Sequence, residues 1–157
     1  MTIPGYSLRT GTSLDRALVV KFMAKTYREL YPHQDLSHLA QTVEHYFSTK
    51  TPVWWVDCQE NRQNNPIGGL WLGSAIDQVT GTRISHIFLL YVAPQHRYQG
   101  IGGYLIKHAE SWAQQRGDTQ IGLQVFIQNQ PALNLYSKLG YKTQSLWMLK
   151  PLPQKET

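Results

Sequence analysis

Residues 97–103, RYQGIGG, combine one basic side chain with three glycines directly ahead of an amphipathic helical pattern. The first N–H groups of a helix have no partner inside the helix, and the helix dipole is positive at that end. Glycines let a ligand approach these groups without Cβ atoms in the way. The segment therefore predicts a loop that binds an anionic group such as a phosphate.

Two other phosphate-binding patterns do not fit this loop. The P-loop pattern GxxxxGK[ST] does not occur in the sequence. The dinucleotide pattern GxGxxG starts at Gly100 but fails at its third glycine, where Leu105 stands.

The loop lies between a predicted strand and a predicted helix. Residues 87–92 are almost entirely apolar, which is typical of a strand buried on both faces at the centre of a sheet. After the loop, apolar residues recur at helical spacing up to Gly117, which suits a helix C-cap. We expect the strand and the helix to hold the loop at one end of the sheet.

Two ordered segments resemble the signatures of the GCN5-related N-acetyltransferase (GNAT) family. Residues 89–106, LLYVAPQHRYQGIGGYLI, resemble its acyl-CoA loop, in which Gln or Arg is followed after two residues by Gly and then by Gly or Ala. Residues 129–141, NQPALNLYSKLGY, resemble its Asn, Ala, Leu-Tyr, Lys, Leu-Gly-Phe/Tyr segment. One departure is Tyr98, where the family often has Gly.

The resemblance implies an α/β fold of the GNAT type, with a mixed, mostly antiparallel central sheet flanked by helices. Two central strands are expected to splay apart, and CoA to insert between them. The cosubstrate is expected to be acetyl-CoA, without a metal. The residues implied in binding it are Leu90, Val92, Arg97, Tyr98, Gln99, Gly100, Ile101, Gly102, Gly103 and Asn129.

Two residues are candidates for proton transfer. Tyr136 occupies the Leu-Tyr position that implies a general acid toward the CoA thiolate, with packing of its helix as the alternative. His86 lies six residues before Val92, an offset at which several family members have a catalytic Glu or His. Strand alternation predicts that His86 shares a face with Leu90 and Val92. The alternatives for His86 are a structural histidine hydrogen-bonded within the sheet and a water chain as the base.

The acceptor is expected to be a primary amine of a small molecule, attacked directly on the thioester. The family builds its acceptor pocket from the first helices and the hairpins, so Glu29, Asp35 and Glu44 are candidates for steering a cationic amine. A protein lysine or N-terminal amine is the competing acceptor. A non-catalytic CoA-binding regulatory domain is the other alternative, although Tyr136 favours an enzyme.

Composition limits the other functions. The net charge of +5 and pI near 9.4 arise from scattered basic residues without an aromatic-basic RNA motif, so nucleic-acid binding is not expected. The charge also argues mildly against a polycationic acceptor. Six histidines lack the spacing of metal ligands, and no apolar run is long enough for a membrane span. Cys58 is the one cysteine, which favours a reducing, cytoplasmic location.

Residues 1–157 are expected to form a single domain, with 151–157 as a polar tail, and a homodimer is compatible with the sequence. Gly11, Thr12 and Ser13 suit a turn and N-cap, and Ser37 suits a second N-cap. Strands are predicted at 6–10, 53–58, 67–72, 87–92, 119–126 and 141–149. Helices are predicted at 14–30, 37–47, 100–117 and 131–139, and turns at 59–66 and 77–82.

Overall fold

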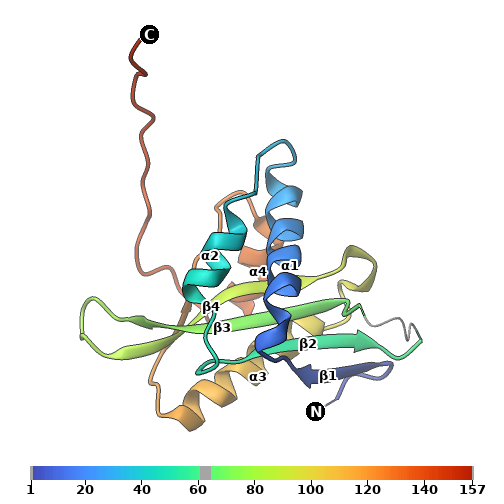
Figure 1. Ribbon diagram of the computed structural model, residues 1–157. Helices are drawn as coiled ribbons and strands as arrows, with labels where there is room; N and C mark the ends of the chain where they lie inside the picture. The colour runs from blue at the N-terminus through green and yellow to red at the C-terminus, as the bar shows by residue number, and fades with distance from the viewer. Residues whose placement is uncertain (1, 61–64, 157) are drawn as a thin grey trace.

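The computed structural model describes residues 2–60 and 65–156 and contains a five-stranded sheet in the order β1-β2-β3-β4-β5 (Figure 1). The first four strands pair antiparallel in chain order, and β5 pairs parallel to β4. The strands are β1 (Tyr6–Thr10), β2 (Val53–Cys58), β3 (Gly68–Ile76), β4 (Arg83–Val92) and β5 (Ile121–Leu123).

Helices cover both faces of this sheet (Figure 1). The helices α1 and α2 pack on one face, and α3 and α4 pack on the other. The helices are α1 (Arg16–Leu30), α2 (Leu39–Tyr46), α3 (Ile101–Arg116) and α4 (Gln130–Lys138), and short 3-10 turns span Ser13–Asp15 and Pro94–His96. The mixed sheet between helix layers agrees with the predicted fold class.

The N-terminal helical segment begins at Ser13, one residue earlier than predicted. Thr12 is the N-cap and forms a capping box with Asp15, whose carboxylate accepts the Thr12 N–H at 2.9 Å. Thr12 is among the residues predicted for this cap, whereas the predicted cap Ser37 is wrong, because α2 begins after His38, and the Ser37 N–H instead donates to the Asp35 carboxylate.

A β-bulge interrupts the pairing of β3 and β4. Trp71 pairs with Leu89, whereas the next residue, Leu72, pairs with Ile87, so Phe88 is an extra residue in β4. Leu89 consequently packs in the core under α1 and α2, and Ile87 packs in the core under α3. The bulge therefore breaks the simple alternation of faces along this strand.

The second edge of β4 is paired over a short stretch. Its partner β5 contacts Ser85–Ile87, so the edge from residue 88 to residue 92 has no strand beside it in the described residues. The predicted strand at 119–126 is reduced to Ile121–Leu123, because the chain then turns away toward α4. The strand 87–92 is thus the second from the end of the sheet and not at its centre.

The predicted last strand at 141–149 is not paired within the chain. These residues form no element in the structure, and the segment runs away from the domain (Figure 1). Leu146, Trp147 and Met148 are 73%, 82% and 84% exposed. Residues 61–64 of the predicted turn at 59–66 lie outside the described residues.

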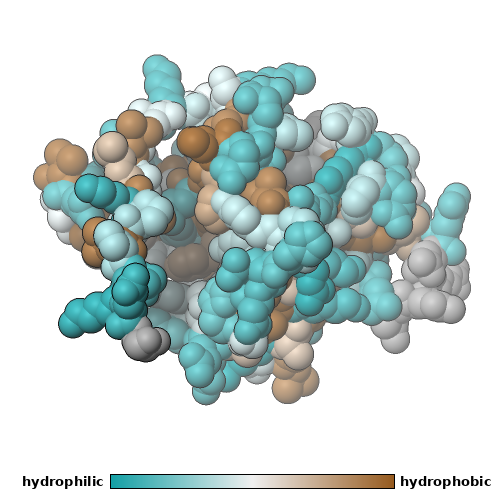
Figure 2. Space-filling view, turned by 90° about the horizontal axis from the view of Figure 1, so that it is seen from above, coloured by the Kyte–Doolittle hydropathy of each residue, from teal (hydrophilic) through white to brown (hydrophobic). Residues whose placement is uncertain are grey.

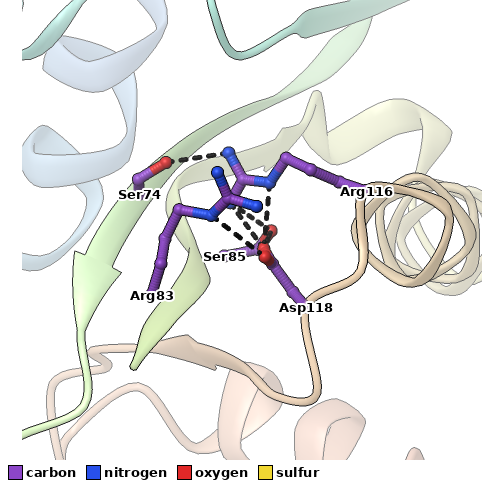
Figure 3. Close-up of polar contacts among 5 residues, drawn as sticks. All are labelled: Ser74, Arg83, Ser85, Arg116 and Asp118. Carbon is purple, nitrogen blue, oxygen red and sulfur yellow. Dashed lines mark hydrogen bonds and ion pairs between the residues drawn. The ribbon is translucent and has the colours of Figure 1, made fainter. Parts of the chain in front are cut away.

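A buried acid joins the ends of several elements at the far end of α3 (Figure 3). The Asp118 carboxylate, 2% exposed, accepts hydrogen bonds from Ser85 Oγ at 2.6 Å and from the guanidinium groups of Arg116 and Arg83. Arg116 also donates to Ser74 Oγ on β3 at 2.9 Å. Burial alone raises the pKa of Asp118, but these hydrogen bonds outweigh it and the pKa lies below its ordinary value. The contacts tie α3 to β3 and β4.

Candidate active site

The loop before α3 has the geometry of an anion site. Gly100 is the N-cap, with φ +86° and no side chain to cap the helix. The first hydrogen bond within the helix runs from the Tyr104 N–H to the Gly100 carbonyl at 3.0 Å. The backbone N–H groups of Ile101, Gly102 and Gly103 therefore have no helical acceptor and can donate to a ligand.

The two glycines inside the first turn differ in what surrounds them. A Cβ at Gly103 would meet nothing within 4 Å, so this position faces open space. A Cβ at Gly102 would lie 3.3 Å from Leu135 Cδ2 on α4, which is a tight contact. Gly102 therefore also permits the close approach of α3 and α4.

The preceding loop residues are held by β1. The Tyr6 hydroxyl lies 2.8 Å from His96 Nδ1 and donates to Gln99 Oε1 at 3.1 Å. Tyr98 has a positive φ of 63° and a side chain 95% exposed, so it projects away from the loop. Sequence reasoning missed Tyr6, because a partner 90 residues away leaves no local pattern.

Arg97 connects the loop to β4 and α1. Its Nε donates to the Val92 carbonyl at 2.7 Å, and its Nη2 pairs with Glu29 at 2.5 Å. The guanidinium carbon lies 5.7 Å from the centre of the Tyr91 ring. Glu29, predicted to steer a cationic acceptor, is thus engaged with the loop arginine in this structure.

The open edge of β4 presents backbone donors beside this loop. The Ala93 N–H donates to Ile67 beside β3, and the Val92 carbonyl accepts from Arg97 on the other side. Because successive residues of a strand direct their N–H and C=O groups to opposite edges, the N–H groups of Val92 and Leu90 point to the open edge.

His86 is on the other face of β4 from Leu90 and Val92, so the predicted common face is wrong. The β-bulge at Phe88 is the reason, because it reverses the alternation between His86 and Leu90. The half-buried His86 ring packs edge-on against Phe88, with ring centres 4.9 Å apart. Burial lowers the pKa of His86 below its ordinary value, which leaves the ring neutral at pH 7.

Aromatic side chains extend from His86 toward α2. The Phe88 ring lies 4.7 Å from Trp71 and 5.4 Å from Tyr46. Trp71 is 1% exposed, and its Nε1 has no hydrogen-bond partner within the described chain. These neighbours of His86 come from three separate elements, so spacing along the sequence did not group them.

Tyr136 lies on the opposite face of the sheet from His86. It packs from α4 against the α3 core, and its ring centre is 5.9 Å from that of Tyr141. Burial raises the pKa of Tyr136 to about 12, so the phenol stays protonated at neutral pH. Across residues 2–60 and 65–156, its hydroxyl makes no hydrogen bond. Asn129 caps the same helix through its Oδ1, 3.4 Å from the Ala132 N–H.

The remaining predicted acids do not gather around His86. Asp35 is fully exposed between α1 and α2, and the backbone hydrogen bond from Ser37 lowers its pKa. Glu44 is exposed on α2. A hollow of about 230 Å³ lined by Thr10, Lys50 and other residues lies at the end of β1 away from Tyr6, and none of the predicted site residues line it.

The family model for the acetyltransferase (GNAT) family matches residues 20–141 of the chain. The chain belongs to this family. The match runs from within α1 to just beyond α4 and includes the loop, the open edge of β4, His86 and Tyr136. GNAT proteins are acetyltransferases, so the prediction of an acyltransferase is confirmed at the level of the family.

Two curated relatives and one solved structure illustrate the similarity. Streptothricin acetyltransferase of Streptomyces lavendulae is 42% identical over 50 residues, 32% of this chain and 26% of the relative. N-acetyltransferase 8 of Rattus norvegicus is 26% identical over 118 residues, which are 75% of this chain and 50% of the relative. The chain thus spans a quarter to a half of these relatives' lengths. A predicted acetyltransferase of Clostridium acetobutylicum, solved with acetyl-CoA, superposes with a TM-score of 0.72 and 18% identity. The superposition covers 93% of this chain and 96% of that protein.

The residues of this GNAT chain fit the donor that the family uses. The uncapped N–H groups after Gly100 suit a pyrophosphate, and the space at Gly103 leaves room for its approach. The open edge of β4 leaves backbone donors for the acyl arm. Among the described residues, no three His, Cys, Asp or Glu side chains gather as metal ligands would. No helix in the described ranges is long and apolar enough to cross a membrane.

Proposed function

We propose that residues 1–157 form one catalytic domain that transfers an acetyl group from acetyl-CoA to a primary amine of a small molecule by direct attack. The observation that carries the proposal is the open edge of β4, with a neutral His86 on one face and a protonated Tyr136 on the other. A thioester at this edge has a base on the α1/α2 side and an acid on the α3/α4 side.

The loop and the strand edge hold the cosubstrate. The N–H groups of residues 101–103 receive the pyrophosphate, Arg97 adds positive charge, and the side chains of Leu90 and Val92 line the α3 side of the edge. Tyr98, Gln99 and Asn129 belong to the segments that border it. An N–H of Leu90 or Val92 supports the negative charge that develops on the thioester carbonyl oxygen.

Proton transfer accompanies the exchange of bonds at the carbonyl carbon. An amine with pKa about 10.4 is protonated at pH 7, so freeing its lone pair costs about 4 to 5 kcal/mol without help from the site. The amine nitrogen forms the new bond to carbon and the sulfur leaves. His86, or a water that it orders, accepts the amine proton, and Tyr136 donates its proton to the departing thiolate.

The acceptor enters on the α1/α2 face in this proposal. Phe88, Trp71 and Tyr46 border His86 there, and the buried Trp71 Nε1 is a free donor. The net charge of +5 disfavours a polycationic protein segment, and one relative in the same family is a streptothricin acetyltransferase. Because Glu29 is paired with Arg97, a cationic acceptor would need to compete for it. We further propose a cytoplasmic enzyme without nucleic-acid or membrane partners.

Thiol release from acetyl-CoA tests the proposal. A panel of small primary amines is compared with a lysine-containing peptide and a peptide with a free N-terminus, at equal amine concentration. We expect turnover with at least one small amine and none with the peptides. Turnover confined to a peptide would replace the small-molecule acceptor with a protein amine. Binding of CoA by calorimetry without thiol release from any acceptor would contradict the catalytic proposal.

A further inference from the structure

The loop before α3 is anchored to a strand on the far side of the sheet. β2 and β3 separate β1 from β4, but the start of β1 and the end of β4 lie at the same end of the sheet (Figure 1). The Tyr6 hydroxyl lies 2.8 Å from His96 Nδ1 and 3.1 Å from Gln99 Oε1. The Tyr6 and His96 rings also meet edge-on, with centres 5.6 Å apart. One side chain of β1 therefore holds the loop at two points.

These two points lie on either side of a strained residue. The φ of Tyr98 is 63°, a left-handed conformation that a residue with a Cβ keeps only where its surroundings hold it. Apolar packing gives little support, because Gln95 and residues 98–100 are exposed. The loop rises at the right of the sheet in Figure 1, and polar side chains predominate on the surface seen from above (Figure 2). Polar contacts therefore maintain the shape of this loop.

The hydrogen-bonding groups around Tyr6 can be assigned from their chemistry. The Gln99 Oε1 atom is a carbonyl oxygen and can only accept, so the single hydroxyl proton of Tyr6 is donated to it. The Tyr6 oxygen must then accept the proton that His96 carries on Nδ1. Removal of the hydroxyl would leave a donor on His96 and an acceptor on Gln99 without this partner.

The held residues lead directly into the anion site. Gln99 precedes the N-cap Gly100, and the N–H groups of residues 101–103 follow it. Gly100 has no side chain to cap the helix, so the position of Gln99 determines how the chain enters α3. A loop that is already held in its binding shape loses less entropy when a ligand binds. Release of Gln99 would therefore weaken binding at these N–H groups.

We propose that Tyr6 is a positioning residue for acetyl-CoA, which holds residues 96–99 so that the N–H groups of residues 101–103 point at the pyrophosphate. Tyr6 acts through His96 and Gln99 and does not touch the reacting atoms. It also lies outside residues 20–141, which the family model matches. The inference rests on the proposed function, in which this loop binds the cosubstrate.

Calorimetry with CoA tests the role of the hydroxyl. Tyr6→Phe keeps the ring beside His96 and removes both hydrogen bonds, so the Kd should rise about three- to thirtyfold. Ser7→Ala is the control, because it removes an exposed hydroxyl from the next residue of β1 and should leave the Kd unchanged. Dephospho-CoA keeps the pyrophosphate and should lose affinity by the same factor. A loss confined to CoA would assign Tyr6 to the 3′-phosphate and contradict the proposal.

Two substitutions of His96 test the contact at Nδ1. Asn carries its amide nitrogen one bond beyond Cγ, as His carries Nδ1, whereas the amide nitrogen of Gln lies near the position of Nε2. His96→Gln should therefore raise the Kd for CoA by a factor similar to that of Tyr6→Phe, and His96→Asn should raise it by at least about threefold less. Equal Kd values for the two His96 variants would show that Nδ1 does not carry the contact.

Steady-state kinetics separate positioning from a general structural effect. With the small amine that supports turnover, Tyr6→Phe should raise the KM for acetyl-CoA and change kcat by less than about twofold, because the lost contacts act on binding. A fall in kcat with an unchanged KM would overturn the proposal. Equal Kd values for wild type and Tyr6→Phe would refute this inference alone, whereas no heat from wild type with CoA would refute the proposed function as well.

Discussion

The two sides of β4 are built to different degrees of completeness. On the β2–β3 side, the sheet is covered by helices on both faces, and Trp55 and Trp71 are 0% and 1% exposed. On the β5 side, the strand has three residues and α4 has no fully buried residue. The anion loop, His86 and the open strand edge all lie at the boundary between these two sides.

This difference places the proposed chemistry at an edge that the fold leaves free. A backbone edge in the middle of a complete sheet has no donors left for a ligand, because the ladder uses them. The well-packed side supplies rigidity, and the incomplete side supplies access. If this division is right, substitutions on the packed side should mainly reduce stability, and substitutions at the open edge should mainly reduce turnover.

The largest loss of stability is expected on the packed side. Trp55→Ala removes a fully buried ring and the hydrogen bond from its Nε1 to Asp15, and should lower the free energy of unfolding by about 3 to 5 kcal/mol. Leu135→Ala on α4 should cost less, because Leu135 is half-buried. Urea denaturation of both variants, with the exposed Leu14→Ala as control, measures the contrast. Equal losses of unfolding free energy in Trp55→Ala and Leu135→Ala would show that the two sides do not differ in packing.

His86→Gln tests the proposed base, which lies between the packed side and the incomplete side of β4. We expect kcat/KM at pH 7 to fall about ten- to a thousandfold, with partial recovery at high pH where free amine is abundant. Because burial lowers the pKa of His86, the neutral base persists below pH 6.5, and the wild-type acid limb attributed to it should lie below that value. A variant with both the wild-type rate and the wild-type acid limb would make His86 structural.

Tyr136→Phe should separate catalysis from packing on the incomplete side. The ring stays, so unfolding should change by less than about 0.5 kcal/mol, since the hydroxyl makes no hydrogen bond in the described residues. Turnover should fall by about tens- to a thousandfold because the thiolate loses its acid. Initial rates measure the turnover, and urea denaturation measures the free energy of unfolding. An unchanged rate would leave Tyr136 with packing alone.

The smallest effect is expected at Tyr98. Its φ of 63° is a left-handed conformation that costs a non-glycine residue about 1 to 2 kcal/mol. A glycine avoids this strain but loses more conformational freedom on folding, so part of the gain is lost. Tyr98→Gly should therefore raise the stability by less than about 1 kcal/mol. Tyr104→Gly, in the interior of α3, should lower it by a similar amount. A loss of stability in Tyr98→Gly would show that the exposed ring contributes more than the backbone strain costs.

The sequence predicted the elements next to the loop well because their signals are local. The apolar run at 87–92 and the spacing up to Gly117 reflect neighbours within one strand and one helix. The face of His86 could not be predicted, because it depends on the register between β3 and β4, which periodicity within β4 does not contain. The Arg97–Glu29 pair joins residues 68 apart and has no local signal either.

The strand prediction at 141–149 failed for a related reason. The composition of the segment is that of a strand, and the structure gives it an extended backbone with no partner in its own chain. Propensity describes what a segment can form, whereas pairing requires an available edge. For Asn129 and Gly102, the resemblance implied cofactor binding, and the structure adds a helix cap and a helix contact at these positions.

The extra residue at Phe88 also affects how the gene can change. Substitutions in β4 alter one side chain at a time, whereas deletion of the codon for Phe88 would restore regular pairing, with Ile87 still under α3 and Leu89 still under α1 and α2. His86 would keep its face, Ser85 would keep Asp118 as its acceptor, and the chain would lose the ring that packs against Trp71 and Tyr46. We therefore expect related genes to include versions of this strand that are one residue shorter at this position.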